Sequence, residues 1–487
     1  MRLAVLLLVT LPAISLAQQI AIGEYVLPTN ASPYGITAGP DGAMWFTENY
    51  NAAIGRIARS GAISAYITTS TGPSSPYGIA AGPDGALWFA DYAGNAIGRV
   101  TTSGAVTEYP VPVPNALPTG IAGGPDGRMW FTMSLDSGAV IGAITTAGAF
   151  TIYQAQGNYT NSITAGSDGA LWYTCPSCEI QRITTSGVYS YYDLPLQDAG
   201  LEAITAGPDG ALWFTEFAAN QIGRITTGGA ITEYPVPTAN SGLMGITAGP
   251  DGALWFTESA VKQIGRITTS GTVTEYPIPA ASYSLPNQIG AGPDGTLWFT
   301  DSYSRIGEVF FVTANLTVSP PSGYYTSHLT FAGSGYAPNE NVRIYYQGVG
   351  SNVLASATAD ATGSFTATAQ APQSPYGPRL FLGVGQSSGK LGAANFSMAP
   401  HLVLSPNSGP PGTIVTVEGY GFGSFEDVRV YWKGLASLGL VVTNAGGTFN
   451  GSPAFTFTVP SDAQSGANVV VGHVASEALG VGVFTVQ

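Results

Sequence analysis

A nine-residue phrase recurs seven times in the first two-thirds of the chain, and its period constrains the fold more than any other feature. The phrase is centred on Gly-Pro-Asp-Gly-Ala-Leu-Trp-Phe-Thr, and neighbouring copies lie 41 to 43 residues apart. Its aspartates are Asp41, Asp84, Asp126, Asp168, Asp209, Asp251 and Asp294. A period of about 42 residues with strand-like content is typical of the blades of a β-propeller. The sequence therefore predicts a seven-bladed β-propeller.

Each repeat divides into four expected strands, and the fifth copy shows them most clearly. Residues 201–206 form the first strand, and Gly207-Pro208-Asp209-Gly210 forms a turn, because Pro presets φ and Gly tolerates the exit geometry. Residues 211–216 are apolar on both faces, so the second strand is expected to be covered by blades on both sides. Residues 222–225 begin the third strand, and residues 231–235 are the outer fourth.

The last repeat lacks its outer strand, and the beginning of the mature chain supplies one. The seventh copy reaches Ile306-Gly307-Glu308-Val309 without a following Thr-Glu-Tyr-Pro strand. The sequence Gly23-Glu24-Tyr25-Val26-Leu27-Pro28 precedes the first repeat. We therefore expect residues 22–28 to pair with residues 306–309, which would close the ring and remove an exposed sheet edge.

Beyond residue 315 a second, shorter repeat begins, with two copies at an offset of 86 residues. Matching pairs are Gly333 with Gly419, Gly335 with Gly421, Val342 with Val428 and Tyr345 with Tyr431. Each copy opens with Ser-Pro and carries a later Gly-x-Phe. Short alternating strands over about 85 residues predict two β-sandwiches. The expected divisions are residues 1–17, a signal peptide, 18–314, the propeller, and 315–399 and 400–487, the two sandwiches.

The first 17 residues have the pattern of a secretory signal peptide. Arg2 precedes an apolar run from Leu3 to Ile14, which Ser15-Leu16-Ala17 ends with small residues. The run is too short to span a bilayer. We therefore expect an exported protein, secreted or at the cell surface, without a transmembrane anchor.

Composition argues against a nucleic-acid partner. Charged residues make up 9% of the chain, the formal net charge is −14, and no basic cluster is present. An acidic chain repels phosphate backbones and anionic membranes.

The two cysteines, Cys175 and Cys178, are separated by Pro176-Ser177. In an exported protein this spacing favours a small local disulfide over a redox motif. A zinc site would need further ligands, which the neighbouring sequence does not supply.

The repeats resemble the virginiamycin B lyase (streptogramin lyase) family. The resemblance rests on phrases such as Ile204-Thr205-Ala206-Gly207, Leu212-Trp213-Phe214-Thr215-Glu216 and Ile222-Gly223-Arg224-Ile225, and it covers residues 20 to 312. It implies a seven-bladed propeller whose lyase members open a cyclic depsipeptide antibiotic by elimination, with magnesium, histidine and glutamate near the central channel. The C-terminal units resemble immunoglobulin-like domains of the TIG (IPT) type, through the sequences at 408–413 and 419–422.

The positions that the resemblance implies for catalysis hold other residues here. The two histidine positions fall on Met244 and Asn287, and the two glutamate positions fall on Leu285 and Ser302. The three histidines of the chain are His328, His401 and His473, all beyond the repeats. Elimination needs a base near the working pH, which Met and Asn cannot supply. No catalytic residue is assigned, and enzymatic activity stays an open question.

Two sets of homologous positions are expected near the central channel. The first lies on the inner strands and holds Tyr34, Tyr77, Thr119, Asn161, Glu202, Met244 and Asn287. The second follows Trp-Phe-Thr or its equivalent and holds Glu48, Asp91, Met133, Cys175, Glu216, Glu258 and Asp301. Five members of the second set are acidic. They are interpreted either as a ring that binds Mg²⁺, Ca²⁺ or a polar ligand, or as solvated strand ends.

Other repeated residues are given structural roles. The turn aspartates are expected to serve turn chemistry, and the arginines of Ile-Gly-Arg are expected to be exposed. The tyrosines of Glu-Tyr-Pro (Tyr109, Tyr234 and Tyr276) are expected to pack between blades rather than to bind carbohydrate.

The hypothesis that best fits the sequence is an exported binding or interaction protein. The ligand-binding candidates are Tyr34, Tyr77, Glu202, Glu48, Asp91, Glu216, Glu258 and Asp301. The partner would be a small molecule, a glycan or a cell-surface protein, and Mg²⁺ or Ca²⁺ is a possible cofactor at the channel. The alternatives are a lyase with a rearranged site and a structural component of the cell envelope.

Overall fold

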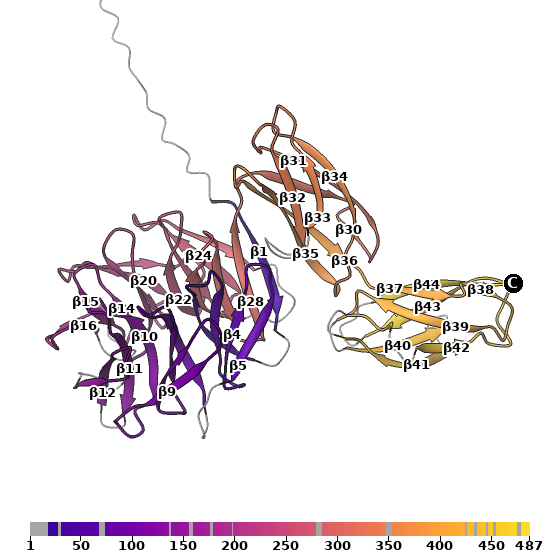
Figure 1. Ribbon diagram of the computed structural model, residues 1–487. Helices are drawn as coiled ribbons and strands as arrows, with labels where there is room; N and C mark the ends of the chain where they lie inside the picture. The colour runs from indigo at the N-terminus through magenta and orange to yellow at the C-terminus, as the bar shows by residue number, and fades with distance from the viewer. Residues whose placement is uncertain are drawn as a thin grey trace, which may run out of the picture.

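In the computed structural model the regular elements of the described residues are all β-strands. The described residues are 18–487, except 28–30, 68–73, 136–137, 155–158, 176–178, 197, 279–284, 347–352, 424–425, 433–435, 445–446, 451–453 and 475–478. The expected signal peptide, residues 1–17, lies outside them. A large body formed by the first two-thirds of the chain is followed by two smaller bodies (Figure 1).

The large body contains seven four-stranded antiparallel sheets, numbered here sheets 1 to 7 in the order of their first repeats. Sheets 1 to 3 are formed by β2 (Pro33–Ala38), β3 (Met44–Glu48), β4 (Ala53–Ile57) and β5 (Ile63–Ile67); β6 (Pro76–Ala81), β7 (Leu87–Asp91), β8 (Ala96–Val100) and β9 (Val106–Pro110); and β10 (Pro118–Gly123), β11 (Met129–Leu135), β12 (Gly138–Ile144) and β13 (Phe150–Gln154). Sheets 4 and 5 are formed by β14 (Ile163–Ala165), β15 (Ala170–Tyr173), β16 (Ile180–Thr184) and β17 (Tyr189–Tyr192), and by β18 (Leu201–Ala206), β19 (Leu212–Glu216), β20 (Gln221–Ile225) and β21 (Ile231–Pro235). Sheets 6 and 7 are formed by β22 (Leu243–Ala248), β23 (Leu254–Glu258), β24 (Gln263–Ile267) and β25 (Val273–Pro277), and by β26 (Pro286–Ala291), β27 (Leu297–Asp301), β28 (Arg305–Phe311) and β1 (Ile20–Val26).

The first strands of the seven sheets form a closed ring. Each contacts the first strand of the next sheet, and β26 of sheet 7 contacts β2 of sheet 1. The ring therefore has an axis, with the first strands innermost and the fourth strands at the rim.

The expected closure by the N-terminal strand is confirmed. β1 pairs antiparallel with β28, from Ile20 opposite Phe311 to Val26 opposite Arg305. Arg59 of sheet 1 also forms an ion pair with Asp294 of sheet 7, with 3.0 Å between Nε and Oδ2. Both contacts join the first and last parts of the ring, so the seventh sheet has no unpaired outer edge at β28.

Tryptophans fill the spaces between sheets. In each of the seven sheets the repeated tryptophan is buried, and a tyrosine of a fourth strand stacks on it with ring centroids 5.2–5.7 Å apart. Tyr109, Tyr234 and Tyr276 stack in this way on Trp88, Trp213 and Trp255, as the packing interpretation predicts.

The turn aspartates do more than form turns. Asp209 Oδ1 accepts the indole N–H of Trp213 at 3.0 Å, and Oδ2 pairs with Arg224 Nε at 2.7 Å. Burial raises the pKa of Asp209, but the Trp213 and Arg224 hydrogen bonds outweigh it and lower that pKa below its usual value. The prediction that the Ile-Gly-Arg arginines are exposed is wrong. Their side chains are only 17–25% exposed, because each pairs with an aspartate beside a tryptophan ring.

The remaining strands form two further groups of sheets. The first group comprises β29 (Asn315–Ser319), β30 (Ser322–Gly323), β31 (His328–Ser334), β32 (Asn341–Tyr346), β33 (Val353–Thr358), β34 (Phe365–Gln370), β35 (Gly377–Gly385) and β36 (Leu391–Met398), in a three-stranded and a five-stranded sheet. The second comprises β37 (His401–Ser405), β38 (Ser408–Gly409), β39 (Ile414–Tyr420), β40 (Asp427–Trp432), β41 (Ala436–Val442), β42 (Phe455–Thr458), β43 (Gly466–His473) and β44 (Leu479–Val486) in one sheet. Each group encloses its own apolar core.

The 86-residue offset is visible in the strands themselves. β29, β30, β31 and β32 have the same lengths and spacing as β37, β38, β39 and β40. Gly333 and Gly419 occupy matching positions, and a Cβ at either would collide with the ring of Phe365 or Phe449. The repeated Gly-x-Phe therefore places its aromatic ring against a glycine of the facing strand.

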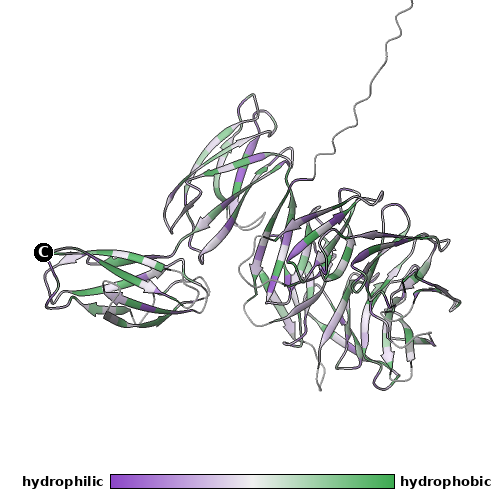
Figure 2. Cartoon of the chain, turned by 180° about the vertical axis from the view of Figure 1, so that it is seen from behind, coloured by the Kyte–Doolittle hydropathy of each residue, from purple (hydrophilic) through white to green (hydrophobic). Residues whose placement is uncertain are grey.

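Hydrophobic and hydrophilic residues alternate along many of these C-terminal strands (Figure 2). β44, for example, alternates exposed and buried residues along its whole length, so it covers a core with one face. Within the described residues, no helix has the length and apolar character needed to cross a membrane.

Candidate functional site

A chain of threonine hydroxyls positions the inner-strand candidates at one end of the ring. Thr47 of sheet 1 donates to the Tyr77 carbonyl of sheet 2 at 2.7 Å. Equivalent bonds join Thr132 to Asn161, Thr174 to Glu202, Thr215 to Met244, Thr257 to Asn287 and Thr300 to Tyr34. Sheet 2 has Ala90 at this position. The backbone of six of the seven inner-strand candidates is thus fixed by the preceding sheet.

All seven inner-strand candidates are half-buried at the start of, or just before, the first strand of their sheet. Tyr34 and Tyr77, from neighbouring sheets, have ring centroids 4.9 Å apart. Tyr77 also contacts Tyr92, with centroids 5.1 Å apart. Tyr50, in the adjoining turn of sheet 1, is 83% exposed and lies close enough to influence Tyr77 electrostatically. We call Tyr34, Tyr50, Tyr77 and Tyr92 the tyrosine cluster.

Tyr50 and Tyr92 were not among the sequence candidates. Both follow the acidic residue that ends the second strand, in a turn whose residues differ between repeats. The sequence signal that could have found them is their place beside Glu48 and Asp91, at the end of the ring where the inner strands begin.

Glu202 is the carboxylate that shares this end of the ring with the tyrosine cluster. Its Oε2 accepts a hydrogen bond from Asn161 Nδ2 at 3.1 Å. Burial raises the pKa of Glu202 to about 6, and the Asn161 hydrogen bond partly opposes that effect. Burial first, and then the charge of Glu202, raise the pKa of Tyr34 to about 12. Because sheets 1 and 5 are not neighbours, the effect on Tyr34 indicates that these side chains face each other across the axis.

The five acidic residues of the second set are fully buried or nearly so, with 0–4% of each exposed. Asp91 Oδ1 accepts the backbone N–H groups of Ser75 and Gly94 at 2.8 and 3.0 Å. Asp301 Oδ1 accepts those of Leu285 and Tyr303 at 3.2 and 2.9 Å. These two aspartates therefore hold the loops beside the axis in place.

The three glutamates of the second set have weaker polar surroundings. Glu48 accepts a hydrogen bond from Asn51 Nδ2 at 2.9 Å, and burial raises the pKa of Glu48. Burial, and secondarily the charge of Glu233, raise the pKa of Glu216 to about 8. Burial and then the charge of Glu275 do the same for Glu258. Each carboxylate is associated with its own sheet, and in the described residues no three histidine, cysteine, aspartate or glutamate side chains gather as a metal site.

The positions that the family resemblance implied for catalysis lie at the same end of the ring. Met244 and Asn287 are half-buried inner-strand residues. Leu285 is 37% exposed, and its carbonyl accepts the backbone N–H of Ser302 at 3.2 Å. The location is therefore that of the inner-strand site, while the side chains present there carry no titratable group.

Cys175 occupies in sheet 4 the position that Glu216 occupies in sheet 5. It is fully buried and disulfide-bonded. Cys178, its expected partner, lies outside the described residues, so the pairing stays a prediction.

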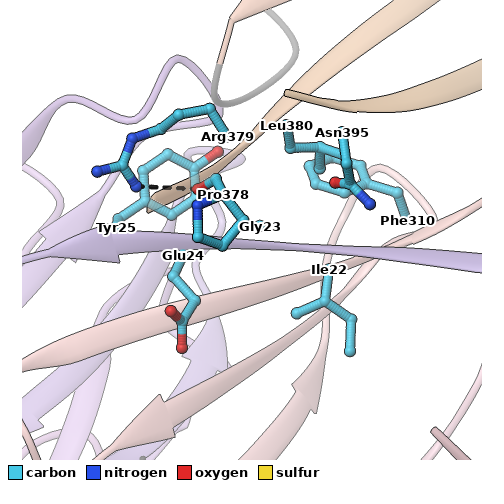
Figure 3. Close-up of a pocket in the computed structure, with 9 residues that line it drawn as sticks. All are labelled: Ile22, Gly23, Glu24, Tyr25, Phe310, Pro378, Arg379, Leu380 and Asn395. Carbon is cyan, nitrogen blue, oxygen red and sulfur yellow. Dashed lines mark hydrogen bonds between the residues drawn. The ribbon is translucent and has the colours of Figure 1, made fainter. Parts of the chain in front are cut away.

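A pocket also lies between the ring and the first C-terminal group. Its lining includes Glu24 and Tyr25 of β1 and Arg379 and Leu380 of β35 (Figure 3). Arg379 donates hydrogen bonds to the carbonyls of Pro375, Tyr376 and Pro378, so its guanidinium is engaged within its own segment. The pocket is a feature of the junction and is separate from the tyrosine cluster.

The closed ring of four-stranded sheets, with half-buried side chains around its axis, defines a β-propeller. The model of the virginiamycin B lyase family matches residues 13–160 and 154–318, and the chain belongs to that family.

Solved structures agree with this assignment. A streptogramin B lyase structure is 39% identical, with a TM-score of 0.57, and the match covers 60% of this chain and 97% of that one. A catalytically inactive variant of the virginiamycin B lyase from Staphylococcus aureus, solved with quinupristin, is 38% identical, with a TM-score of 0.57 and coverage of 60% and 100%. The WD40 β-propeller domain of Doa1, 10% identical with a TM-score of 0.51 and coverage of 60% and 97%, shares the fold.

A curated relative matches over a shorter stretch. The virginiamycin B lyase of Saccharopolyspora erythraea is 46% identical over 48 residues, which are 10% of this chain and 16% of that protein.

Proposed function

We propose that this protein is an exported, seven-bladed β-propeller that binds an uncharged or cationic ligand with aromatic or ring-shaped apolar parts. The binding site would be the end of the ring that carries the tyrosine cluster and Glu202. The domain division is residues 18–314 for the propeller, 315–399 and 400–487 for two immunoglobulin-like sandwiches of the TIG (IPT) type, and 1–17 for a signal peptide. Small molecules, glycans and cell-surface proteins are the ligand classes.

The observation that carries this proposal is the half-buried tyrosine cluster facing a single carboxylate. Tyrosine faces offer apolar area and attract cations. Glu202 adds a hydrogen-bond acceptor whose charge depends on pH, because its pKa of about 6 lies near neutrality. Pockets that combine aromatic walls with a few polar groups are typical of ligand sites.

The test is binding of quinupristin, the ligand named in a related structure, measured by isothermal titration calorimetry. Tyr34→Ala and Tyr77→Ala should each weaken binding about tenfold, since an aromatic contact contributes roughly 0.5–1.5 kcal/mol beyond its area. Tyr191→Ala, which removes a 59% exposed tyrosine of the outer strand β17, is the matched control and should not change affinity. Equal effects of all three variants would contradict the proposed location.

A lyase activity is the second candidate, and one observation favours it. Burial brings the pKa of Glu202 to about 6, nearer to the range that suits a general base. We nevertheless expect no measurable opening of the quinupristin ring with excess Mg²⁺, followed by mass spectrometry. Losing a general base costs roughly 10² to 10⁴ in rate. Turnover that Glu202→Gln, Glu258→Gln or Asp301→Asn abolishes would replace the binding proposal with the lyase.

A further inference from the structure

One face of sheet 5 brings two glutamates and a glutamine together around a glycine. Glu216 of β19 lies opposite Gln221 of β20, and Gly223 of β20 lies opposite Glu233 of β21. Residues directly opposite each other in antiparallel strands share a face of the sheet, as do residues two apart in one strand. A Cβ at Gly223 would lie 2.7 Å from Oε1 of Glu216, so this carboxylate rests where a side chain would otherwise stand.

These side chains present several oxygen atoms that accept no hydrogen bond. Glu216 is 0% exposed, and neither of its carboxylate oxygens has a hydrogen-bond partner. Oε1 of Gln221 and Oε1 of Glu233 are also buried without one. A buried carboxylate without a compensating donor or charge is costly, so it is normally neutralised by a proton, an ion pair or a metal. The raised pKa of Glu216 expresses the same lack of a neighbouring positive charge.

Sheet 7 shows what neutralises the equivalent positions elsewhere in the ring. Asp301 lies opposite Arg305, and Gly307 lies opposite Glu24. Nη1 of Arg305 is 2.9 Å from Oε2 of Glu24. Arg305 therefore stands where sheet 5 has Gln221, and it supplies the positive charge between the two carboxylate-bearing strands.

Sheet 6 repeats the residue types of sheet 5, with Glu258, Gln263 and Glu275 in register. Its outer carboxylate is already engaged, because Glu275 accepts hydrogen bonds from the backbone N–H and the hydroxyl of Thr238 at 2.9 and 3.0 Å. Sheet 5 thus keeps the set of oxygen atoms with the fewer partners of the two.

We propose that sheet 5 binds a calcium ion through Glu216, Gln221 and Glu233. Carboxylate and amide oxygens are ligands that Ca²⁺ prefers, and its coordination number of six to eight leaves places for water molecules beside three side chains. This face of sheet 5 packs against sheet 4, since Phe214 and Trp172 share one apolar cluster. The site therefore lies in the wall of the ring, separate from the tyrosine cluster, and does not depend on the ligand proposed above.

The test uses the full mature chain, stripped of metal with a chelator and titrated with Ca²⁺. Thermal unfolding and equilibrium dialysis with metal analysis are measured in parallel. Ca²⁺ at a hundredfold excess over its Kd should raise the Tm of the propeller by about 5 °C. Glu216→Gln should abolish that rise and remove one bound Ca²⁺ per chain relative to the unaltered protein. Asp462→Asn, which removes an exposed carboxylate in the turn before β43, is the control and should keep both.

Gln221→Arg gives a second, independent arm, because it copies the arrangement of sheet 7. This variant should fold without Ca²⁺, show no Ca²⁺-dependent rise in Tm, and bind one Ca²⁺ fewer. A Ca²⁺ response that survives in both Glu216→Gln and Gln221→Arg would overturn the site, as would the absence of any response in the unaltered protein. A response to Mg²⁺ but not to Ca²⁺ would overturn the assignment of calcium.

Discussion

Sheets 5 and 7 carry acidic residues at the same two positions of the repeat, yet they are built and neutralised differently. Sheet 5 is a single continuous segment, in which Glu216 and Glu233 face Gln221. Sheet 7 joins the two ends of the ring, and its two acidic residues, Asp301 and Glu24, have Arg305 between them. The sheet that must recruit a distant strand is the one that carries its own internal cation.

The difference has a physical reason in strand register. A fourth strand connected by a short turn is placed by the chain itself, whereas β1 must find β28 across almost the whole propeller. A slip by one residue would turn Glu24 to the opposite face and leave Arg305 without its carboxylate. Figure 3 shows Glu24 and Ile22 on the same side of β1, away from Arg379, so the strand presents a definite face to its sheet. The ion pair thus favours one register of closure.

The largest effect should come from removing the closing strand. Deleting residues 18–30 exposes the edge of β28 and takes away the buried Ile22, Tyr25 and Leu27. Each large apolar side chain contributes roughly 1.5–3 kcal/mol on burial, so the Tm should fall by about 10 °C or more. Differential scanning calorimetry of the mature chain with and without these residues checks this. Coincident unfolding transitions would mean that sheet 7 closes without β1.

A smaller loss should follow when sheet 7 is made to resemble sheet 5. Arg305→Gln leaves Asp301 and Glu24 without their cation, and partial solvent access keeps the cost to about 2–3 kcal/mol, below that of a fully buried pair. Arg343→Gln, at an exposed position of β32, should change stability by less than about 0.5 kcal/mol. Urea unfolding of both variants measures the difference. The comparison fails if Arg305→Gln behaves like its control.

The third effect concerns pH and sheet 5 in the presence of a chelator. Burial raises the pKa of Glu216 to about 8 in the folded protein, above its unfolded value near 4.5. The folded state therefore binds more protons, and its stability should fall as the pH rises from 4.5 to 8. Glu216→Gln should flatten the dependence of Tm on pH over this window, while Asp462→Asn should leave it unchanged. Parallel curves for the two variants would show that Glu216 does not titrate as inferred.

The smallest effect is expected in sheet 4, where Cys175 takes the position of Glu216. A disulfide between Cys175 and Cys178 closes a very short loop, so its reduction should cost less than the roughly 3 kcal/mol of a 15-residue loop. Thiol counting under denaturing conditions and thermal unfolding with and without a reductant measure both properties. Two free thiols in the exported protein would refute the pairing.

The sequence predicted the strands well because the repeat combines turn chemistry with alternation. The second strand of sheet 5, for example, was expected at residues 211–216 and spans Leu212–Glu216. The pairing of β1 with β28 followed from a missing outer strand. A motif counted seven times identifies its own gaps, which a single segment cannot do.

The directions of the acidic side chains could not be predicted in the same way. Glu202 and Glu216 both lie near the axis, but Glu216 shares its face with Phe214 and is buried between sheets. A register shift between Leu201 and Ile204 separates the two positions, and the sequence carries no direct mark of that irregularity. The pairing of the arginines with the turn aspartates was missed because the two residues lie 14 or 15 positions apart in the chain.

The threonine chain around the axis has a consequence for how this fold can diversify. Each hydroxyl holds the backbone carbonyl of the next sheet's inner residue and leaves that residue's side chain free. The seven positions accordingly hold Tyr, Tyr, Thr, Asn, Glu, Met and Asn within one frame. A new specificity can therefore arise by exchanging these side chains one at a time, while the bonds that define the frame remain in place. Adaptability and rigidity reside in different atoms of the same residues.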